Sequence, residues 1–147
     1  MNEHLIELAK RALALKNSGK LGEAAALFEN ILVEQPGWEH GYGAFSLAEC
    51  YEGEGNLKKA KAAYENAVRQ NPSDPILLGG YASFLYLHGE ASQAFDAYLR
   101  LLPIDLAQRD SQGATATVLA LNELGRRLGL SKEAIGVQIA QASIGEK

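Results

Sequence analysis

The feature of this chain that most constrains its fold is a spacing that occurs three times. A glycine is followed five residues later by an alanine in Gly19–Ala24, Gly55–Ala60 and Gly89–Ala94, at intervals of 36 and 34 residues. An aromatic residue follows each alanine after four more positions, and a small residue precedes each glycine by seven. These spacings belong to one face of a helix. A period near 34 residues therefore predicts stacked helix pairs.

Each part of the repeat has a physical role in such a pair. The small residue lets the second helix approach the first, the glycine ends the first helix in a left-handed conformation, and the alanine and aromatic residue pack against the neighbouring pair. The pattern resembles that of the tetratricopeptide repeat family and is most complete in the second unit. The matching residues there are Leu47, Ala48, Tyr51, Gly55, Ala60, Tyr64, Ala67 and Pro72.

The resemblance implies an all-α fold, a right-handed superhelical α-solenoid of antiparallel helix pairs. Composition agrees, because Ala and Leu outnumber the β-branched residues more than threefold and 147 residues suit one ordinary domain. We expect a single domain over residues 1–147. Its predicted parts are three tetratricopeptide units at about 5–38, 41–74 and 75–108, a connection at about 103–113, and a capping helix pair at about 114–143.

Turn residues and helix caps divide the units into individual helices. Asp74 followed by Pro75, for example, is an N-cap with proline in the first helical position. Pro103 comes three residues earlier than the prolines of the other units, so we expect it to shorten the helix that contains it. The predicted helices of the three units span 3–17, 21–34, 38–53, 57–70, 75–88 and 91–102.

The C-terminal segment also has a second interpretation. Residues 124–131 resemble a helix-turn-helix, with Gly129 in the turn and Ser131 opening the second helix. Residues 103–147 carry five basic and five acidic side chains, and the net charge of the whole chain is −4, so a positive face for DNA is missing. A DNA-associated regulator is thus an alternative function, and nucleic acid is not the expected partner.

Residue patterns that carry catalysis, metals or cofactors are missing from this sequence. His4, His40 and His88 are far apart and lack ligand partners at metal-binding spacing. Cys50 is the single cysteine, so it cannot form an internal disulfide. We predict a non-enzymatic protein with no catalytic, cofactor-binding or metal-binding residues.

The N-terminal residues and the apolar stretches predict a soluble, cytoplasmic protein that does not enter a membrane. The first residues include Glu3 and Glu7 and no apolar block, unlike a secretory signal. The longest nearly apolar stretch, 76–87, is interrupted by two glycines and a serine.

The surface of the predicted helix pairs is the remaining candidate for function. The helix predicted at 38–53 has a core stripe and a second stripe that begins with Tyr42 and Phe45 and ends in glutamates. The second stripe is either a binding surface or a wider core contact, formed by a short superhelix or by the C-terminal helices folding back. The resemblance implies that the first helix of each pair lines a concave groove. Carried over residue by residue, the partner-binding groove comprises Ile6, Leu13, Tyr42, Phe45, Glu49, Glu52, Ile76, Ser83 and Tyr86.

These groove residues predict a protein-interaction scaffold or adaptor that binds a peptide or helix of apolar or amphipathic character. Basic residues in the partner would offset the unfavourable negative charge of Glu52 and Glu54, which lie at the C-terminus of a predicted helix. A second alternative is self-association into a homo-oligomer. Acidic chaperone tails are not expected, because the positions that bind them in the family carry no cation here. Those positions are Ala9, Leu13, Ser46, Ile76 and Gly80.

Overall fold

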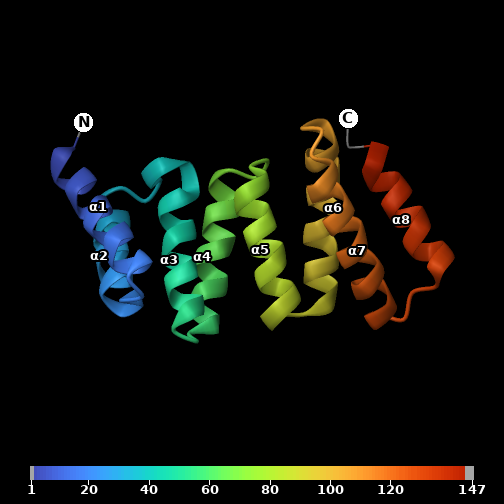
Figure 1. Cartoon of the computed structure of the whole chain (residues 1–147), viewed down its shortest axis with the longest axis horizontal. Helices are drawn as coiled ribbons and strands as arrows, with labels where there is room; N and C mark the ends of the chain where they lie inside the picture. The colour runs from blue at the N-terminus through green and yellow to red at the C-terminus, as the bar shows by residue number, and fades with distance from the viewer. Residues whose placement is uncertain (1, 145–147) are drawn as a thin grey trace. The chain divides into compact units, whose positions relative to one another are not determined.

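The computed structural model describes residues 2–144, and all regular elements in that range are helices (Figure 1). The described helices form two compact units that divide between Pro72 and Ser73, and each unit is described by itself. The expected single domain stays a prediction. In chain order the elements are α1 (Glu3–Asn17), α2 (Leu21–Glu34), η1 (Trp38–Gly41), α3 (Tyr42–Gly53), α4 (Leu57–Gln70), α5 (Pro75–His88), α6 (Ala91–Ala107), α7 (Ser111–Arg127) and α8 (Lys132–Ile144).

Unit 1 contains α1 to α4, and each of these helices contacts the next. Ala12 and Ala48, the small residues of the repeat, are completely buried, as close helix approach requires. The aromatic residues of the repeat, Phe28 and Tyr64, are also buried. The bounds of α1, α2 and α4 are those that the sequence predicted.

Unit 2 contains α5 to α8, and α6 is its central helix because it contacts all three others. Helix α5 has its predicted bounds, and Asp74 accepts hydrogen bonds from the backbone amides of Ile76 and Leu77, as an N-cap should. The core is mainly aliphatic. Its most deeply buried side chains include Leu77, Leu78, Leu85, Leu102, Leu121, Leu124 and Ile135. None of the described helices is long and apolar enough to span a lipid bilayer.

The repeat glycines do not all have the predicted conformation. Gly19 and Gly55 are left-handed, with φ of 82° and 80°, which confirms the prediction for the first two units. For Gly89 the prediction is wrong, because its backbone is extended with φ of −111°. A Cβ at Gly89 would lie 3.1 Å from the Cα and carbonyl oxygen of Leu85. Glycine is needed there for close backbone approach and not for a left-handed turn.

The prediction that Pro103 ends its helix early is also wrong. Helix α6 continues through Pro103 to Ala107, so the connection predicted at 103–113 is only residues 108–110. Leu102 is 1% exposed, and the last turn places the buried Asp105 where it accepts a hydrogen bond of 3.0 Å from the Thr117 hydroxyl of α7. Packing of this turn against α7 offsets the backbone hydrogen bond that proline cannot donate.

The helix predicted at 38–53 has a different beginning. Residues Trp38–Gly41 form the 3-10 turn η1, in which Glu39 and His40 are left-handed and Gly41 has φ of 98°. The Trp38 side chain packs against the start of α3, where a Cβ on Gly43 would come within 3.0 Å of its ring. This contact accounts for the turn, because residues 38–41 must fold back for the Trp38 side chain to reach the first turn of α3.

Asp105→Asn is expected to stabilise the protein at neutral pH. Burial raises the pKa of Asp105 above its usual 3.8, the Thr117 hydrogen bond opposes the shift, and Asp110 adds to it. Because the pKa of Asp105 is higher in the folded protein than in the unfolded chain, this carboxyl ionises first in the unfolded chain. The free energy of unfolding therefore falls as the pH rises through the folded pKa. Asparagine still accepts the hydrogen bond from Thr117 but carries no charge, so we expect the variant to be the more stable protein at neutral pH.

The pH dependence distinguishes this effect from a general one. The advantage of Asp105→Asn over the wild type should disappear below pH 3.8, where the Asp105 carboxyl is protonated in the unfolded chain as well as in the folded protein. Thermal melts across the pH range measure it. Asp96→Asn, on the exposed face of the same helix, is the matched control and should leave the melts unchanged. A loss of stability in Asp105→Asn at neutral pH would contradict the prediction.

Candidate functional site

In unit 1 the groove residues lie on α1 and α3, which an ion pair joins. Lys16 Nζ of α1 is 2.8 Å from Glu49 Oε1 of α3, and both side chains are partly withdrawn from water. Leu13, one turn before Lys16, is 44% exposed, and Ile6 is half-buried. Two adjoining first helices thus present apolar side chains beside a paired charge.

The aromatic residues of α3 form a cluster with α4. The Tyr42 and Phe45 rings meet edge to face with centroids 6.3 Å apart, and the Phe45 and Tyr64 rings meet at 5.6 Å. Tyr64 belongs to the repeat core, so the second stripe of α3 contacts the core, which was one of the two alternatives that the sequence left open. A charged substitution at Phe45 would therefore disturb folding as well as any binding.

Both glutamates of the predicted groove have partners inside unit 1. Glu49 pairs with Lys16, and Glu52 accepts a 2.6 Å hydrogen bond from the Tyr64 hydroxyl. Burial, and then this hydrogen bond, raise the pKa of Tyr64. Helical periodicity within α3 could not reveal these contacts, because the partners come from other helices.

Cys50 of α3 is completely buried. Burial raises the pKa of its thiol to about 11, and Glu49 and Glu54 add to the shift while Lys16 opposes it. The thiolate is the reactive form of cysteine. Cys50 therefore acts as a small core side chain, and it offers no nucleophile at neutral pH.

In unit 2 the predicted groove residues are on α5. Ile76 is 59% exposed and Ser83 is exposed, whereas the ring of Tyr86 is half-buried. The Arg127 guanidinium of α7 lies 4.9 Å from the centroid of that ring, a cation–π contact, and the Tyr98 ring meets it edge to face at 6.5 Å. Arg127 is not among the predicted groove residues, and it is 41 positions away from Tyr86 in the chain.

Within residues 2–144, the His, Cys, Asp and Glu side chains form no group of three that could hold a metal ion. Comparison with known proteins gives the family of the chain. A sequence model of the tetratricopeptide repeat matches residues 47–114. The chain belongs to the tetratricopeptide repeat family.

One curated tetratricopeptide relative is the TPR repeat-containing protein YvcD of Bacillus subtilis. The two are 30% identical over 126 residues, which cover 84% of this chain and 26% of YvcD. The chain thus spans about a quarter of the length of this relative.

Several solved structures share the fold. The type III secretion translocator chaperone SycD of Yersinia enterocolitica has a TM-score of 0.73 at 18% identity, covering 86% of this chain and 96% of SycD. SycD in complex with a peptide of the translocator YopD has a TM-score of 0.66 at 20% identity, covering 81% and 95%. The Sgt2 TPR domain from Aspergillus fumigatus has a TM-score of 0.69 at 16% identity, covering 87% and 81%. At these identities the likeness shows the fold, an α-solenoid of tetratricopeptide helix pairs.

Helices α7 and α8 are the pair for which the sequence predicts a cap. Gly129 between them is left-handed with φ of 78°, as in the first two units. Gly125 and Gln138 occupy the positions of the aromatic residues, and Gln138 is exposed. Gly125 is buried, and a Cβ there would lie 2.5 Å from Cγ1 of Ile135. The two helices therefore approach one another closely at Gly125 and Ile135.

Proposed function

We propose that this chain is a non-enzymatic scaffold or adaptor that holds a peptide or helix of another protein. The observation that carries the proposal is the apolar surface of α1 and α3. These helices adjoin through the Lys16–Glu49 pair, yet Leu13 remains 44% exposed beside them. Apolar side chains between neighbouring helices suit the apolar face of an amphipathic segment.

A structural neighbour supports a peptide partner, since the chaperone SycD was solved in complex with a peptide of YopD. In unit 2 we assign the corresponding surface to Ile76, Ser83 and Tyr86 of α5. Glu49 and Glu52 favour a partner that has basic residues next to its apolar ones. This preference for basic residues is weaker than the preference for apolar ones, because Lys16 and Tyr64 already interact with these carboxylates.

Leu13→Glu is expected to abolish partner capture while the protein stays folded. The new carboxylate would have to be desolvated against the apolar face of the ligand, which should weaken binding at least about tenfold. Folding should change little because Leu13 is already 44% exposed. Affinity capture from the native lysate, followed by mass spectrometry, compares the proteins that each variant retains.

Val33→Glu is the matched control for this experiment. Val33 is 81% exposed on α2, the second helix of the same pair, so the substitution adds the same charge away from the proposed surface. Circular dichroism melts should be unchanged for both variants. A Leu13→Glu protein that is folded and retains the same partners as Val33→Glu would contradict the proposed surface.

A further inference from the structure

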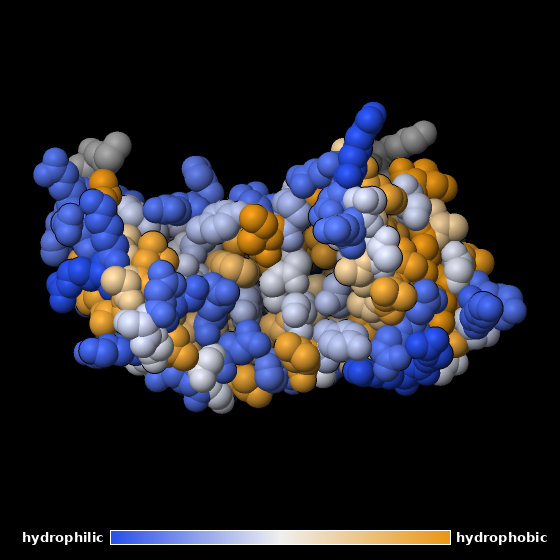
Figure 2. Space-filling view, viewed as in Figure 1, coloured by the Kyte–Doolittle hydropathy of each residue, from blue (hydrophilic) through white to orange (hydrophobic). Residues whose placement is uncertain are grey.

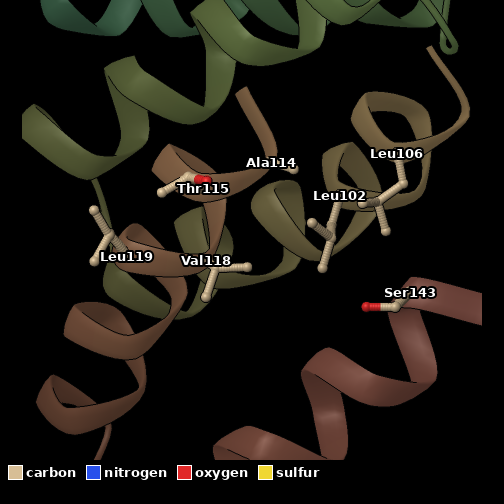
Figure 3. Close-up of a pocket in the computed structure, with 7 residues that line it drawn as sticks. All are labelled: Leu102, Leu106, Ala114, Thr115, Val118, Leu119 and Ser143. Carbon is tan, nitrogen blue, oxygen red and sulfur yellow. The ribbon is translucent and has the colours of Figure 1, made fainter. Parts of the chain in front are cut away.

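Two hollows lie along α7 in unit 2, apart from the surfaces described above. The first has a volume of about 290 Å³ and is lined mainly by apolar side chains of α6 and α7, with Ser143 of α8 opposite (Figure 3). The second has a volume of about 530 Å³, and Arg126, Lys132 and Ile135 are among the residues that line it. Leu119 lines both hollows, so they adjoin at this side chain.

The residues that line the hollows fall at helical spacing. On α7 they include Thr115, Leu119, Asn122 and Arg126, which follow one another after four, three and four residues. Such residues form one stripe along a helix. We call the two hollows together the α7–α8 groove. From Thr115 to Arg126 it extends about 16 Å at 1.5 Å per residue, or roughly three helical turns.

The groove is apolar along most of its length and open to water. Leu119 is 66% exposed, and Leu106 at the edge of the first hollow is 43% exposed. Figure 2 shows apolar side chains gathered over α7 and α8, and Ile144 of α8 adds a further one at 77% exposure. Exposed apolar patches of this kind mark interaction sites.

The other end of the groove is basic. Arg126 and Lys132 line the second hollow, and acidic side chains are not among the residues that line either hollow. Arg126 is 3.0 Å from Glu123, but this carboxylate also pairs with Arg127 at 3.3 Å. Exposed pairs of this kind contribute little stability. Arg126 can therefore turn to a ligand while Arg127 keeps Glu123 paired.

We propose that the α7–α8 groove binds an acidic amphipathic helix of a partner protein. The apolar side chains of that helix contact Leu119 and the first hollow, and its carboxylates pair with Arg126 and Lys132. Charge complementarity selects this occupant. A second copy of the chain that docked through the same face would bring the same two cations and no carboxylate from its groove lining.

Fluorescence anisotropy with a designed probe tests the proposal on the full chain. The probe is a labelled amphipathic helical peptide of about four turns, with a leucine stripe and glutamates in its first turn. A second probe has lysines in place of these glutamates. We expect the glutamate probe to bind at least about tenfold more tightly than the lysine probe. Equal binding of both probes, or no binding, would overturn the proposal.

Variants locate the binding of the probe. Leu119→Glu should weaken the glutamate probe at least about tenfold. Arg126→Gln combined with Lys132→Gln should remove the preference for glutamate over lysine. Leu87→Glu, which is on α5 of the same unit and starts from a side chain of matching 65% exposure, should change neither result. The proposal fails if Leu87→Glu weakens the probe as much as Leu119→Glu.

Folding and self-association are measured on the same proteins. Melts by circular dichroism should show that each variant folds, as expected for exposed positions. Sedimentation at two concentrations should show that the wild type is monomeric under the assay conditions. A wild-type dimer that Leu119→Glu converts to a monomer would assign the groove to a second copy and overturn the acidic helix as its occupant.

Discussion

Deletion of residues 109–147, which removes α7 and α8, is expected to lower the melting temperature sharply or to make the chain aggregate. The two helices bury Leu121, Leu124 and Ile135 almost completely. A fully buried aliphatic side chain contributes about 1.5–3 kcal/mol. The deletion would also leave the Asp105 carboxyl without its Thr117 hydrogen bond. In a helical repeat the loss of an end interface lowers stability directly.

A shorter deletion shows whether the effect comes from this interface. Deletion of residues 129–147 removes α8, of which only Ile135 is buried among the described residues, so we expect a smaller loss. Calorimetry measures the melting temperature of both truncated chains, and light scattering measures their monodispersity. Together they show which deletion has the larger effect. The prediction is wrong if the longer deletion leaves both the melting temperature and the monodispersity unchanged.

Helix positions could be predicted from the sequence because the signals that set them are local. Asn56 caps α4 by accepting from the Lys59 amide, and Gly55 just before it is left-handed. Such caps and turns act within a few residues, so spacing alone reveals them. The end of α6 depends instead on the contact between Asp105 and Thr117, two residues on different helices. Local proline rules cannot include that contact.

The candidate surface was less predictable, since it depends on which side chains meet across helices. Repeat spacing placed Tyr86 on the first helix of its pair, but it could not show that Arg127 lies over the ring. It likewise placed Glu52 on an exposed stripe, where the structure has Tyr64 donating to the carboxylate. The α7–α8 groove was missed for a related reason. Degenerate spacing in this pair indicates weak packing but not where the resulting hollows lie.

Gly125→Ala is expected to destabilise the protein although alanine is the better helix former. The added Cβ would lie 2.5 Å from Cγ1 of Ile135 and 3.4 Å from Cε1 of Phe95. Ile135 is 2% exposed, so it has little room to move. Overpacking of a core of this kind costs about 1–3 kcal/mol. The cost should exceed the roughly 1 kcal/mol that alanine contributes over glycine within a helix.

Gly136→Ala is the matched substitution and is expected to have the opposite sign. Gly136 is exposed within α8, and no atom lies within 4 Å of an added Cβ. Alanine should therefore stabilise this helix by about 0.5–1 kcal/mol, because it loses less backbone freedom on folding. Denaturant unfolding of both variants measures the two free energies. If Gly125→Ala were as stable as Gly136→Ala, then α7 and α8 would not approach one another through Gly125 and Ile135.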